Sequence, residues 1–423
     1  MSERIVIKEI CEVYDGPHAT PKKTVDGPVY LGIDAITDDG KINAKEFAHL
    51  SEEDYIKWTK RVTPQYGDIV FSYEATLGRY ALIPKDFYGC LGRRLAIIRN
   101  VSKDIDTLWL YYYFLSPEWN RFIQSKIIKG STVNRISVED FPTYTVPNIS
   151  IKVQRKIANI LSKIDEKIAL NNNINDNLEQ QAKLLYDYWF TQFDFPDESG
   201  KPYRSSGGKM VWNEQLKMEI PFSWVCSKME NAIEAVRTGL NPRNNFKLGN
   251  GNIQYITVKN LCLNGSLDFS GCDTIDEQAR QIIHRRSDIQ IDDILFASIA
   301  PLGRCYLIQE NPTNWDINES VFSIRYNSSV LTAEYLYMNL QSEAFVKRAT
   351  ACSTGSIFKG IRINSLMDSE IILPPLSVTK EFSKEIKPLF ALQKELDRET
   401  HTLIQLRDWL LPVLMNGQAT ISD

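Results

Sequence analysis

The sequence predicts an α+β fold in which two mixed α/β domains, related by pseudo-symmetry, are joined by two long helices. The first observation is a phrase that occurs twice, since Leu77–Arg79 returns as Leu302–Arg304, 225 positions later. The same offset relates Asp68 to Asp293 and Gly130 to Gly355. Short tandem repeats build solenoids, but two copies of this length indicate two whole domains. The second observation is a heptad pattern that follows each copy.

Length and composition are those of a soluble chain with more than one domain. The chain has 423 residues, whereas single domains usually hold roughly 100–200. No stretch is apolar enough to span a membrane, and the opening MSERIVIKEI carries charges where a secretory signal is apolar. The seven cysteines are scattered and form no CxxC pair. We therefore expect a cytoplasmic protein with no membrane partner and no metal site.

Each copy begins with short strands and continues with an aromatic-rich helical segment. Strands are predicted in GPVYLGIDAI, GDIVFSY and RYALIP, and again in NIQYITV, DDILFAS and RCYLIQ. Helical spacing of apolar residues follows in DTLWLYYYFLSPEWNRFIQSK and in TAEYLYMNLQSEAFVKRA. These patterns make both domains mixed α/β.

Each copy ends in a long helix with a sustained apolar seam. Apolar residues recur at heptad spacing in both, at Ile157, Leu161, Ile164, Ile168, Leu178, Ala182, Leu185 and Trp189, and at Phe382, Leu389, Leu396, Leu403 and Leu410. Heptads of this length favour a coiled coil, and the alternative is a helix packed once on a globular core.

Three residues interrupt these seams. Asn171 and Asn175 lie on the first seam, where they either fix the register of the helix pair or form a weak, hydrated point. Pro388 lies within the second seam and should kink that helix or mark its true start.

These patterns divide the chain into five parts. We expect a first domain at 1–148, a central helix at 149–190, a linker at 191–222, a second domain at 223–375 and a C-terminal helix at 376–418. The connecting segment FDFPDESGKPYRSSGGKMVWNEQLKMEIPFSW, residues 193–224, is marked by its clustered Pro, Gly and Ser residues.

The sequence carries no recognisable catalytic motif. The sequence contains no phosphate-binding glycine loop, no HExxH and no GxSxG. Its four histidines do not pair with other plausible metal ligands. We therefore predict no catalytic residues, no bound metal and no bound cofactor, and a chain that binds rather than reacts.

Equivalent basic segments of the two copies are candidates for binding DNA. Residues 119–138 and 344–363 carry Lys and Arg but no acid, and each contains a Gly-Ser loop, although the net charge of the chain is −4. Small hydroxyl residues, backbone N–H groups and basic side chains suit phosphate contacts, whereas a basic loop can also be only a solvated surface. The predicted DNA-binding residues here are Lys129, Ser131, Thr132, Asn134, Arg135, Thr354, Ser356, Lys359 and Arg362.

A second candidate surface is an early loop, DGPHATPKK in the first copy and LNPRNNFK in the second. The predicted DNA-binding residues in it are His18, Thr20, Lys22, Lys23, Arg243, Asn244, Asn245 and Lys247. The alternative is a variable surface loop. Arg79 and Arg304 follow a turn glycine, and each either touches DNA or pairs with a carboxylate of its own copy.

Several segments together resemble the specificity subunit of type I restriction–modification enzymes. They are DGPHATP, KGSTVNRISVEDFPTYTVPNISIKVQRKIANILSKID, LLYDYWFTQFDFPDESGKPYRSSGGKMVWNE and LRDWLLPVLMNGQ, and the resemblance extends over nearly the whole chain. The start of the second helix, PPLSVTKEF, departs from the pattern because it lacks the glutamine that Gln154 supplies in the first.

The resemblance implies a non-catalytic subunit with two target-recognition domains, each reading one half of a split site in double-stranded DNA. It also implies that the helices pair as an antiparallel coiled coil, which sets the unread spacer and docks methylation subunits. About 33 helical residues would give a rod of about 50 Å. The implied partners are two methylation subunits, which use S-adenosylmethionine, and restriction/translocase subunits, which use ATP and Mg.

Two other functions stay open at this point. A coiled-coil assembly scaffold would bind protein through its repeated domains, and an enzyme would rely on chemistry that no motif reveals. A two-part DNA sequence preference would separate the first reading from both.

Overall fold

The computed structural model describes residues 3–130, 133–352 and 360–417. Within the chain, two compact units separate, one formed by Met1–Asn171 with Arg398–Asp423 and the other by Asn172–Asp397. Each unit therefore contains a mixed domain and a stretch of both long helices. We call them unit 1 and unit 2.

Unit 1 contains three small sheets, with strand orders β2-β8-β5-β6, β4-β3-β7 and β1-β9. All pairings are antiparallel except that of β3 with β7. The strands are β1 (Arg4–Val6), β2 (Cys11–Asp15), β3 (Thr24–Leu31), β4 (Ala48–His49), β5 (Ile69–Ser72), β6 (Tyr80–Leu82), β7 (Gly89–Leu91), β8 (Leu95–Asn100) and β9 (Thr145–Pro147). The helices of the domain are α1 (Glu52–Trp58), α2 (Thr107–Leu115) and α3 (Pro117–Ser125).

Unit 2 repeats this arrangement, with strand orders β13-β19-β16-β17, β15-β14-β18 and β12-β20, and adds a β10-β11 hairpin. The strands are β10 (Met210–Asn213), β11 (Met218–Pro221), β12 (Val225–Lys228), β13 (Ile233–Thr238), β14 (Ile253–Ile256), β15 (Asp273–Ile275), β16 (Ile294–Ala297), β17 (Cys305–Leu307), β18 (Trp315–Ile317), β19 (Val321–Tyr326) and β20 (Glu370–Leu373). The helices are α5 (Glu277–Ser287), α6 (Ala333–Gln341), α7 (Glu343–Ala351) and α8 (Ile363–Met367).

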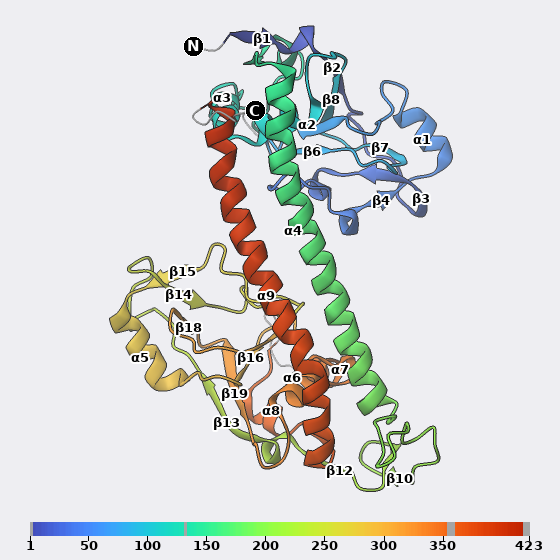
Figure 1. Cartoon of the computed structure of the whole chain (residues 1–423), viewed down its shortest axis with the longest axis vertical. Coiled ribbons are helices and arrows are strands. Elements are labelled where there is room, and N and C mark those ends of the chain that lie inside the picture. Colours follow the sequence, from blue (N-terminus) through green and yellow to red (C-terminus); the bar gives the residue numbers. More distant parts are fainter. Residues whose placement is uncertain (1–2, 131–132, 353–359, 418–423) are drawn as a thin grey trace. The chain divides into compact units, whose positions relative to one another are not determined.

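Short helical turns complete both units, namely η1 (Ile7–Glu9), η2 (Ile33–Ala35), η3 (Ala44–Glu46), η4 (Phe141–Thr143), η5 (Asp187–Thr191) and η6 (Met229–Asn231). The parallel pairing repeats too, because β14 and β18 run parallel as β3 and β7 do. In Figure 1, α5 lies beside β18 and α1 lies beside β7, each within its own unit. The predicted α+β fold with two related domains is confirmed.

The repeated Leu-Gly-Arg phrase forms the turn between β5 and β6 and the equivalent turn between β16 and β17. Gly78 has φ +74° and Gly303 has φ +90°, in the left-handed region that a residue without Cβ enters most easily. A Cβ on Gly303 would also lie 2.7 Å from Val346 Cγ2. The turn geometry thus accounts for the glycine of the phrase.

The core of unit 1 forms where α2 and α3 cover the β2-β8-β5-β6 sheet. Trp109 and Trp119 are almost fully buried there, and the Trp119 indole N–H donates to the Tyr80 hydroxyl at 2.8 Å. The long helices supply Leu161 and Leu414 to the same core. The seam residues of the helices therefore also pack on the domain.

The core of unit 2 is built in the same way from the β13-β19-β16-β17 sheet and helices α6 and α7. Tyr335 and Phe345 are buried, together with Tyr186 and Phe382 from the long helices. The Asn339 amide donates to the Tyr186 hydroxyl at 3.0 Å, so this buried phenol has a partner.

The two long helices, α4 (Ile151–Tyr186) and α9 (Leu376–Met415), pack against each other in both units. In unit 1, Arg407 donates to Asp165 at 3.2 Å, and Asn171 donates to Glu399 at 2.8 Å. Partner numbers rise along one helix as they fall along the other, so the pairing is antiparallel. The predicted helix pair is confirmed.

The structure shows how the helix pair accommodates the three residues that interrupt the seams. Asn171 is fully buried and Asn175 donates to Asp397 at 2.7 Å, so both amides are bonded to α9 rather than left to water. Pro388 lies inside α9, twelve residues beyond its first residue, Leu376. The interpretation of Pro388 as the start of that helix is therefore wrong.

Neither a membrane span nor a metal cluster is found in the residues that the structure describes. No helix among them is both long and apolar enough to cross a bilayer. Likewise, no group of three or more His, Cys, Asp and Glu side chains in those residues could hold a metal ion.

Candidate nucleic-acid interface

Four loops of unit 1 meet at one edge of the β2-β8-β5-β6 sheet, and backbone hydrogen bonds join them. Tyr73 N donates to Arg94 O at 3.1 Å, and Ile136 N donates to Tyr73 O at 2.8 Å. The early loop joins through Gly16 N, which donates to Leu95 O at 3.0 Å. We call residues 15–23, 73–79, 92–95, 128–130 and 133–136 the first rim.

The described ends of the Gly-Ser segment are paired through their backbones. Ile128 and Arg135 exchange two backbone hydrogen bonds, at 2.9 and 3.1 Å. The backbone of Arg135 also forms an isolated antiparallel β-bridge with that of Glu74. Of the described residues between them, Lys129, Gly130 and Asn134 are exposed and Val133 is half-buried. The backbone pairing of Ile128 with Arg135 thus fixes both ends of this segment, while Lys129 and Asn134 face solvent.

Unit 2 repeats two of these bonds, since Ser298 N donates to Ser320 O at 3.1 Å and Ile361 N donates to Ser298 O at 2.9 Å. Its early loop is joined by a different bond, from Gly239 N to Asn318 O at 3.1 Å. We call residues 239–247, 298–304, 318–320 and 360–362 the second rim. Because peptide groups form the frame, its side chains can vary without loss of these bonds.

Acidic side chains of the first rim lie beside a histidine and an arginine. His18 Nε2 lies 2.8 Å from Asp15 Oδ2, and Arg94 Nε lies 3.3 Å from Glu74 Oε1. Burial, followed by the charge of Asp15 and a hydrogen bond to it, raises the pKa of Tyr73. Charge of both signs therefore lies on this rim.

Side chains of the second rim are neutral at the equivalent places. Ile299 and Ser320 stand where the frame of unit 1 has Glu74 and Arg94. The Ser298 hydroxyl donates to Ser320 O at 2.8 Å, and Ser320 N donates to Asn318 Oδ1 at 3.0 Å. The two rims share a frame but differ in chemistry.

The structure places the residues predicted from the first copy on the first rim. All of the described ones except Arg79 are exposed, namely His18, Thr20, Lys22, Lys23, Lys129, Asn134 and Arg135. Ser131 and Thr132 lie outside the described residues. Two surfaces predicted separately, the early loop and the Gly-Ser loop, thus belong to one edge.

The described residues predicted from the second copy lie on the second rim. Arg243, Asn244, Asn245, Lys247 and Arg362 are exposed. The early loop is anchored by the Tyr255 hydroxyl, which donates to Leu240 O at 2.6 Å. Thr354, Ser356 and Lys359 lie outside the described residues.

The two turn arginines differ in their partners. Arg79 Nε donates to Asp38 Oδ1 at 2.6 Å, which is the carboxylate pairing considered from sequence. Arg304 Nη1 instead donates to the backbone oxygen of Val258 at 3.2 Å. Among the described residues no carboxylate pairs with Arg304, so the carboxylate interpretation is wrong for that copy. DNA contact by either arginine stays a prediction.

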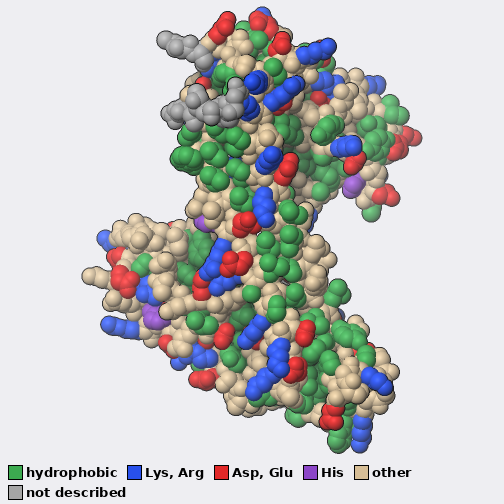
Figure 2. Space-filling model, viewed as in Figure 1, with side chains coloured by type: hydrophobic (Ala, Val, Ile, Leu, Met, Phe, Trp, Pro, Cys, Tyr) green, Lys and Arg blue, Asp and Glu red, His purple; other side chains and the backbone are tan. Residues whose placement is uncertain are grey.

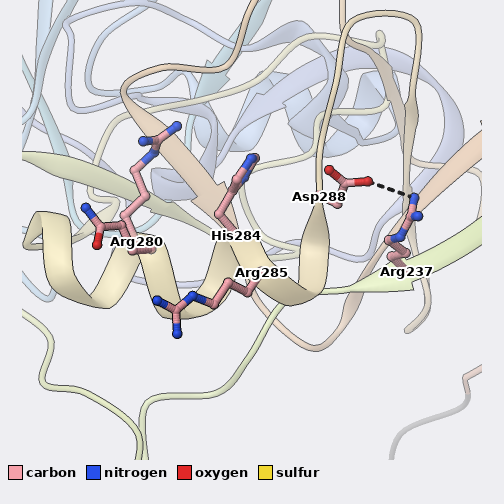
Figure 3. Close-up of a pocket in the computed structure, with 6 residues that line it drawn as sticks. Arg237, Arg280, His284, Arg285 and Asp288 are labelled. Carbon is pink, nitrogen blue, oxygen red and sulfur yellow. Dashed lines mark ion pairs between the residues drawn. The ribbon is translucent and has the colours of Figure 1, made fainter.

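A basic surface on α5 was missed by the sequence reasoning. It lies over a depression of about 540 Å³ lined by Arg237, Arg280, Gln281, His284, Arg285 and Asp288. Figure 3 shows Arg280, His284 and Arg285 on α5, with Arg285 extending away from the Arg237–Asp288 pair. The Arg-rich segment ARQIIHRRS could have indicated this basic surface from the sequence. That Arg237 of β13 joins the surface is evident only from the fold.

Carboxylates hold part of this surface in place. Arg237 Nη1 lies 3.2 Å from Asp288 Oδ2, and His284 Nδ1 lies 3.2 Å from Asp316 Oδ2. Burial raises the pKa of Asp316, and hydrogen bonds from Ser287 and the Ile317 N–H together with His284 oppose that rise. The exposed Arg285 extends into solvent, where it can meet an anion.

The equivalent helix of unit 1 has the opposite character, since the first turn of α1 carries Glu52, Glu53 and Asp54. On the face shown in Figure 2, Lys and Arg side chains are interspersed with Asp and Glu side chains. Basic character in this chain is therefore local, as the net charge of −4 indicates.

Known proteins that are similar to this chain share one description. Residues 2–180 match the family model of the type I restriction modification DNA specificity domain. The chain is 22% identical over 380 residues to the Type I restriction enzyme MjaIX specificity subunit of Methanocaldococcus jannaschii, covering 89% of this chain and 82% of the relative. It is 20% identical to the HindI specificity subunit of Haemophilus influenzae, covering 83% of this chain and 86% of that protein.

A solved structure agrees with the fold over almost the full length. The crystal structure of the S subunit of a type I restriction-modification system from M. genitalium aligns with a TM-score of 0.57 and 14% identity, covering 99% of this chain and 96% of the other. At that identity the likeness concerns the fold, including the two domains and the two long helices.

Proposed function

Because this chain belongs to the family of type I restriction–modification specificity subunits, a non-catalytic component of those enzymes, we propose that it reads a two-part DNA site, one half with each mixed domain. The first rim would read one half and the second rim the other. Both rims would contact base edges in the major groove, where every base pair presents a distinct pattern of donors and acceptors.

The observation that carries this proposal is the shared frame with unlike side chains. Two backbone hydrogen bonds recur at equivalent places on the two rims, and Glu74 and Arg94 of one rim correspond to Ile299 and Ser320 of the other. A repeated frame gives two similar docking geometries, whereas different side chains give two different sequence preferences.

The charges of the chain make DNA binding dependent on its partners. With a net charge of −4, the chain neutralises few phosphates by itself, so its own affinity for DNA should be low and sensitive to salt. We propose that methylation subunits supply further contacts, modify the bound site with S-adenosylmethionine, and act beside restriction/translocase subunits that use ATP and Mg, in the cytoplasm.

We propose that α4 and α9 set the unread spacer and dock the methylation subunits. The helices have 36 and 40 residues, which at a rise of about 1.5 Å per residue gives lengths of about 54 and 60 Å. Such lengths exceed one turn of DNA, about 34 Å, and so suit two half-sites separated by a gap.

Paired substitutions on the two rims test the proposal. Lys129→Ala with Arg135→Ala removes two exposed cations from the first rim, and Arg243→Ala with Arg362→Ala removes two from the second. With the methylation partners present, each pair should weaken recognition of one half-site and leave the preference at the other unchanged. Binding would be measured by gel shift with duplexes mutated in one half at a time.

The alternative outcomes are distinct. Equal loss at both halves from either pair would contradict two independent readers. Binding that ignores DNA sequence with all partners present would instead favour an assembly scaffold whose domains bind protein.

A further inference from the structure

We propose that Arg94 and Glu74 act together to read one G·C base pair in the half-site bound by the first rim. This inference rests on the proposed function and adds the residues and the base pair. No pattern in the sequence singles out either residue, because β5 and β8 bring them together from segments twenty residues apart.

The backbone of Arg94 is the first observation. Its φ is +73°, in the left-handed region that residues other than Gly, Asn and Asp rarely adopt. Such conformations are strained and concentrate at functional sites. The equivalent residue, Ser320, forms the same frame bond without a left-handed φ, so the frame itself does not require this conformation.

The placement of the guanidinium is the second observation. Arg94 Nε lies 3.3 Å from Glu74 Oε1, and the two side chains are only 30% and 28% exposed. The Arg94 Nε atom is buried and has no hydrogen-bond partner in the described part of the chain. The guanidinium therefore lies beside the carboxylate, and the exposed part of the Arg94 side chain is open to a ligand.

The carboxylate argues for a base edge rather than a phosphate. A phosphate beside Arg94 would lie close to Glu74 and would be repelled by it. A G·C pair in the major groove offers guanine O6 and N7 as acceptors and the cytosine N4 amino group as a donor. The arginine can donate to both guanine acceptors while the glutamate accepts from the cytosine amino group, so the two side chains together complement a G·C pair.

The location on the rim is consistent with this role. The Arg94 backbone oxygen accepts from Tyr73 N. The backbone of Glu74 forms a β-bridge with that of Arg135, next to the Gly-Ser segment. Contacts to phosphate by exposed cations of that segment would fix the register in which the pair meets a base edge.

The test uses the full chain assembled with its methylation subunits and a library of duplex DNA randomised in both halves. Selected sequences should contain one invariant G·C pair in one half. Arg94→Ala and Glu74→Ala should each reduce the preference for G·C at that position by about 10- to 100-fold, with every other position unchanged.

Two further variants separate reading from folding and from charge. Arg94→Gly places glycine at a φ that suits it, so the melting temperature should not fall while the G·C preference is lost. Arg93→Ala removes the same charge from an exposed neighbour, and it should weaken all sequences alike without changing the preferred bases.

If Arg94→Ala and Glu74→Ala keep every base preference and two-part recognition stays intact, this inference is overturned while the proposed function stands. A uniform loss of affinity over all sequences would overturn it as well, since that is the behaviour of a phosphate contact. If the unsubstituted complex selects no two-part motif, the proposed function fails and this inference fails with it.

Discussion

Each domain contains a buried carboxylate held by an arginine, and removal of that arginine should destabilise only the unit to which it belongs. Asp293 is 1% exposed, and Arg325 donates to both of its oxygens, at 2.9 and 2.8 Å. The equivalent pair in unit 1 is Asp68, 3% exposed, with Arg99 at 2.8 and 2.7 Å. The perturbations are Arg325→Ala and, as its matched control, Arg99→Ala.

The magnitude follows from what remains around the carboxylate. Breaking a buried ion pair by removing one partner typically costs about 3–5 kcal/mol. Asp293 would still accept from Gln290 N at 2.9 Å and Ser323 Oγ at 3.2 Å, and Arg325 is 16% exposed, so water can reach part of the space. We therefore expect the lower end, about 3 kcal/mol, which is roughly a 150-fold change in the unfolding equilibrium.

Hydrogen exchange followed peptide by peptide measures the two units separately. Arg325→Ala should lower protection in β13, β16 and β19 and leave β2, β5 and β8 unchanged, and Arg99→Ala should do the reverse. Unaltered protection in both units, or an equal loss in both after either substitution, would refute the reasoning.

Three other predictions concern pH, the helix seam and the spacer. Burial raises the pKa of Asp316, so the folded state holds this proton more tightly than the unfolded state does. The unfolding free energy should thus fall as pH rises from about 4 through the raised pKa, and urea titrations over pH should show that Asp316→Asn lacks this part of the slope. Asn171→Ala removes the amide that donates to Glu399 and Thr400 of α9, so thermal denaturation should show unit 1 destabilised by about 0.5–1.5 kcal/mol, and an unchanged or higher melting temperature would contradict this. Deletion of one heptad from both α4 and α9 should change the spacer in the preferred DNA site, as measured by selection from a library of varied gaps, and an unchanged spacer would refute the role of the helices.

The features that the sequence predicted are those with a period or a repeat. The offset of 225 related the strands of one domain to those of the other, and the heptads located α4 and α9, because burial of an apolar seam imposes a regular pattern. The expectation that α9 starts at Pro388 was wrong because packing of the helix outweighs the cost of a proline within it.

The features that sequence reasoning missed depend on contacts between distant segments. The rims arise where loops from four parts of the chain exchange backbone hydrogen bonds, which leave no mark on residue type. The carboxylate partner of Arg79 is Asp38, 41 positions away, whereas Arg304 has a carbonyl partner, although both follow the same turn. The left-handed conformation of Arg94 is likewise invisible in a sequence that places no glycine there.

The methylated motif in genomic DNA tests the central claim most directly, in cells that carry this protein with its methylation partners. The account predicts a motif split into two unlike halves around a gap of unspecified bases, with a G·C pair fixed in the half that responds to substitutions on the first rim. A continuous motif, or two halves that both change after substitution of one rim, would contradict it.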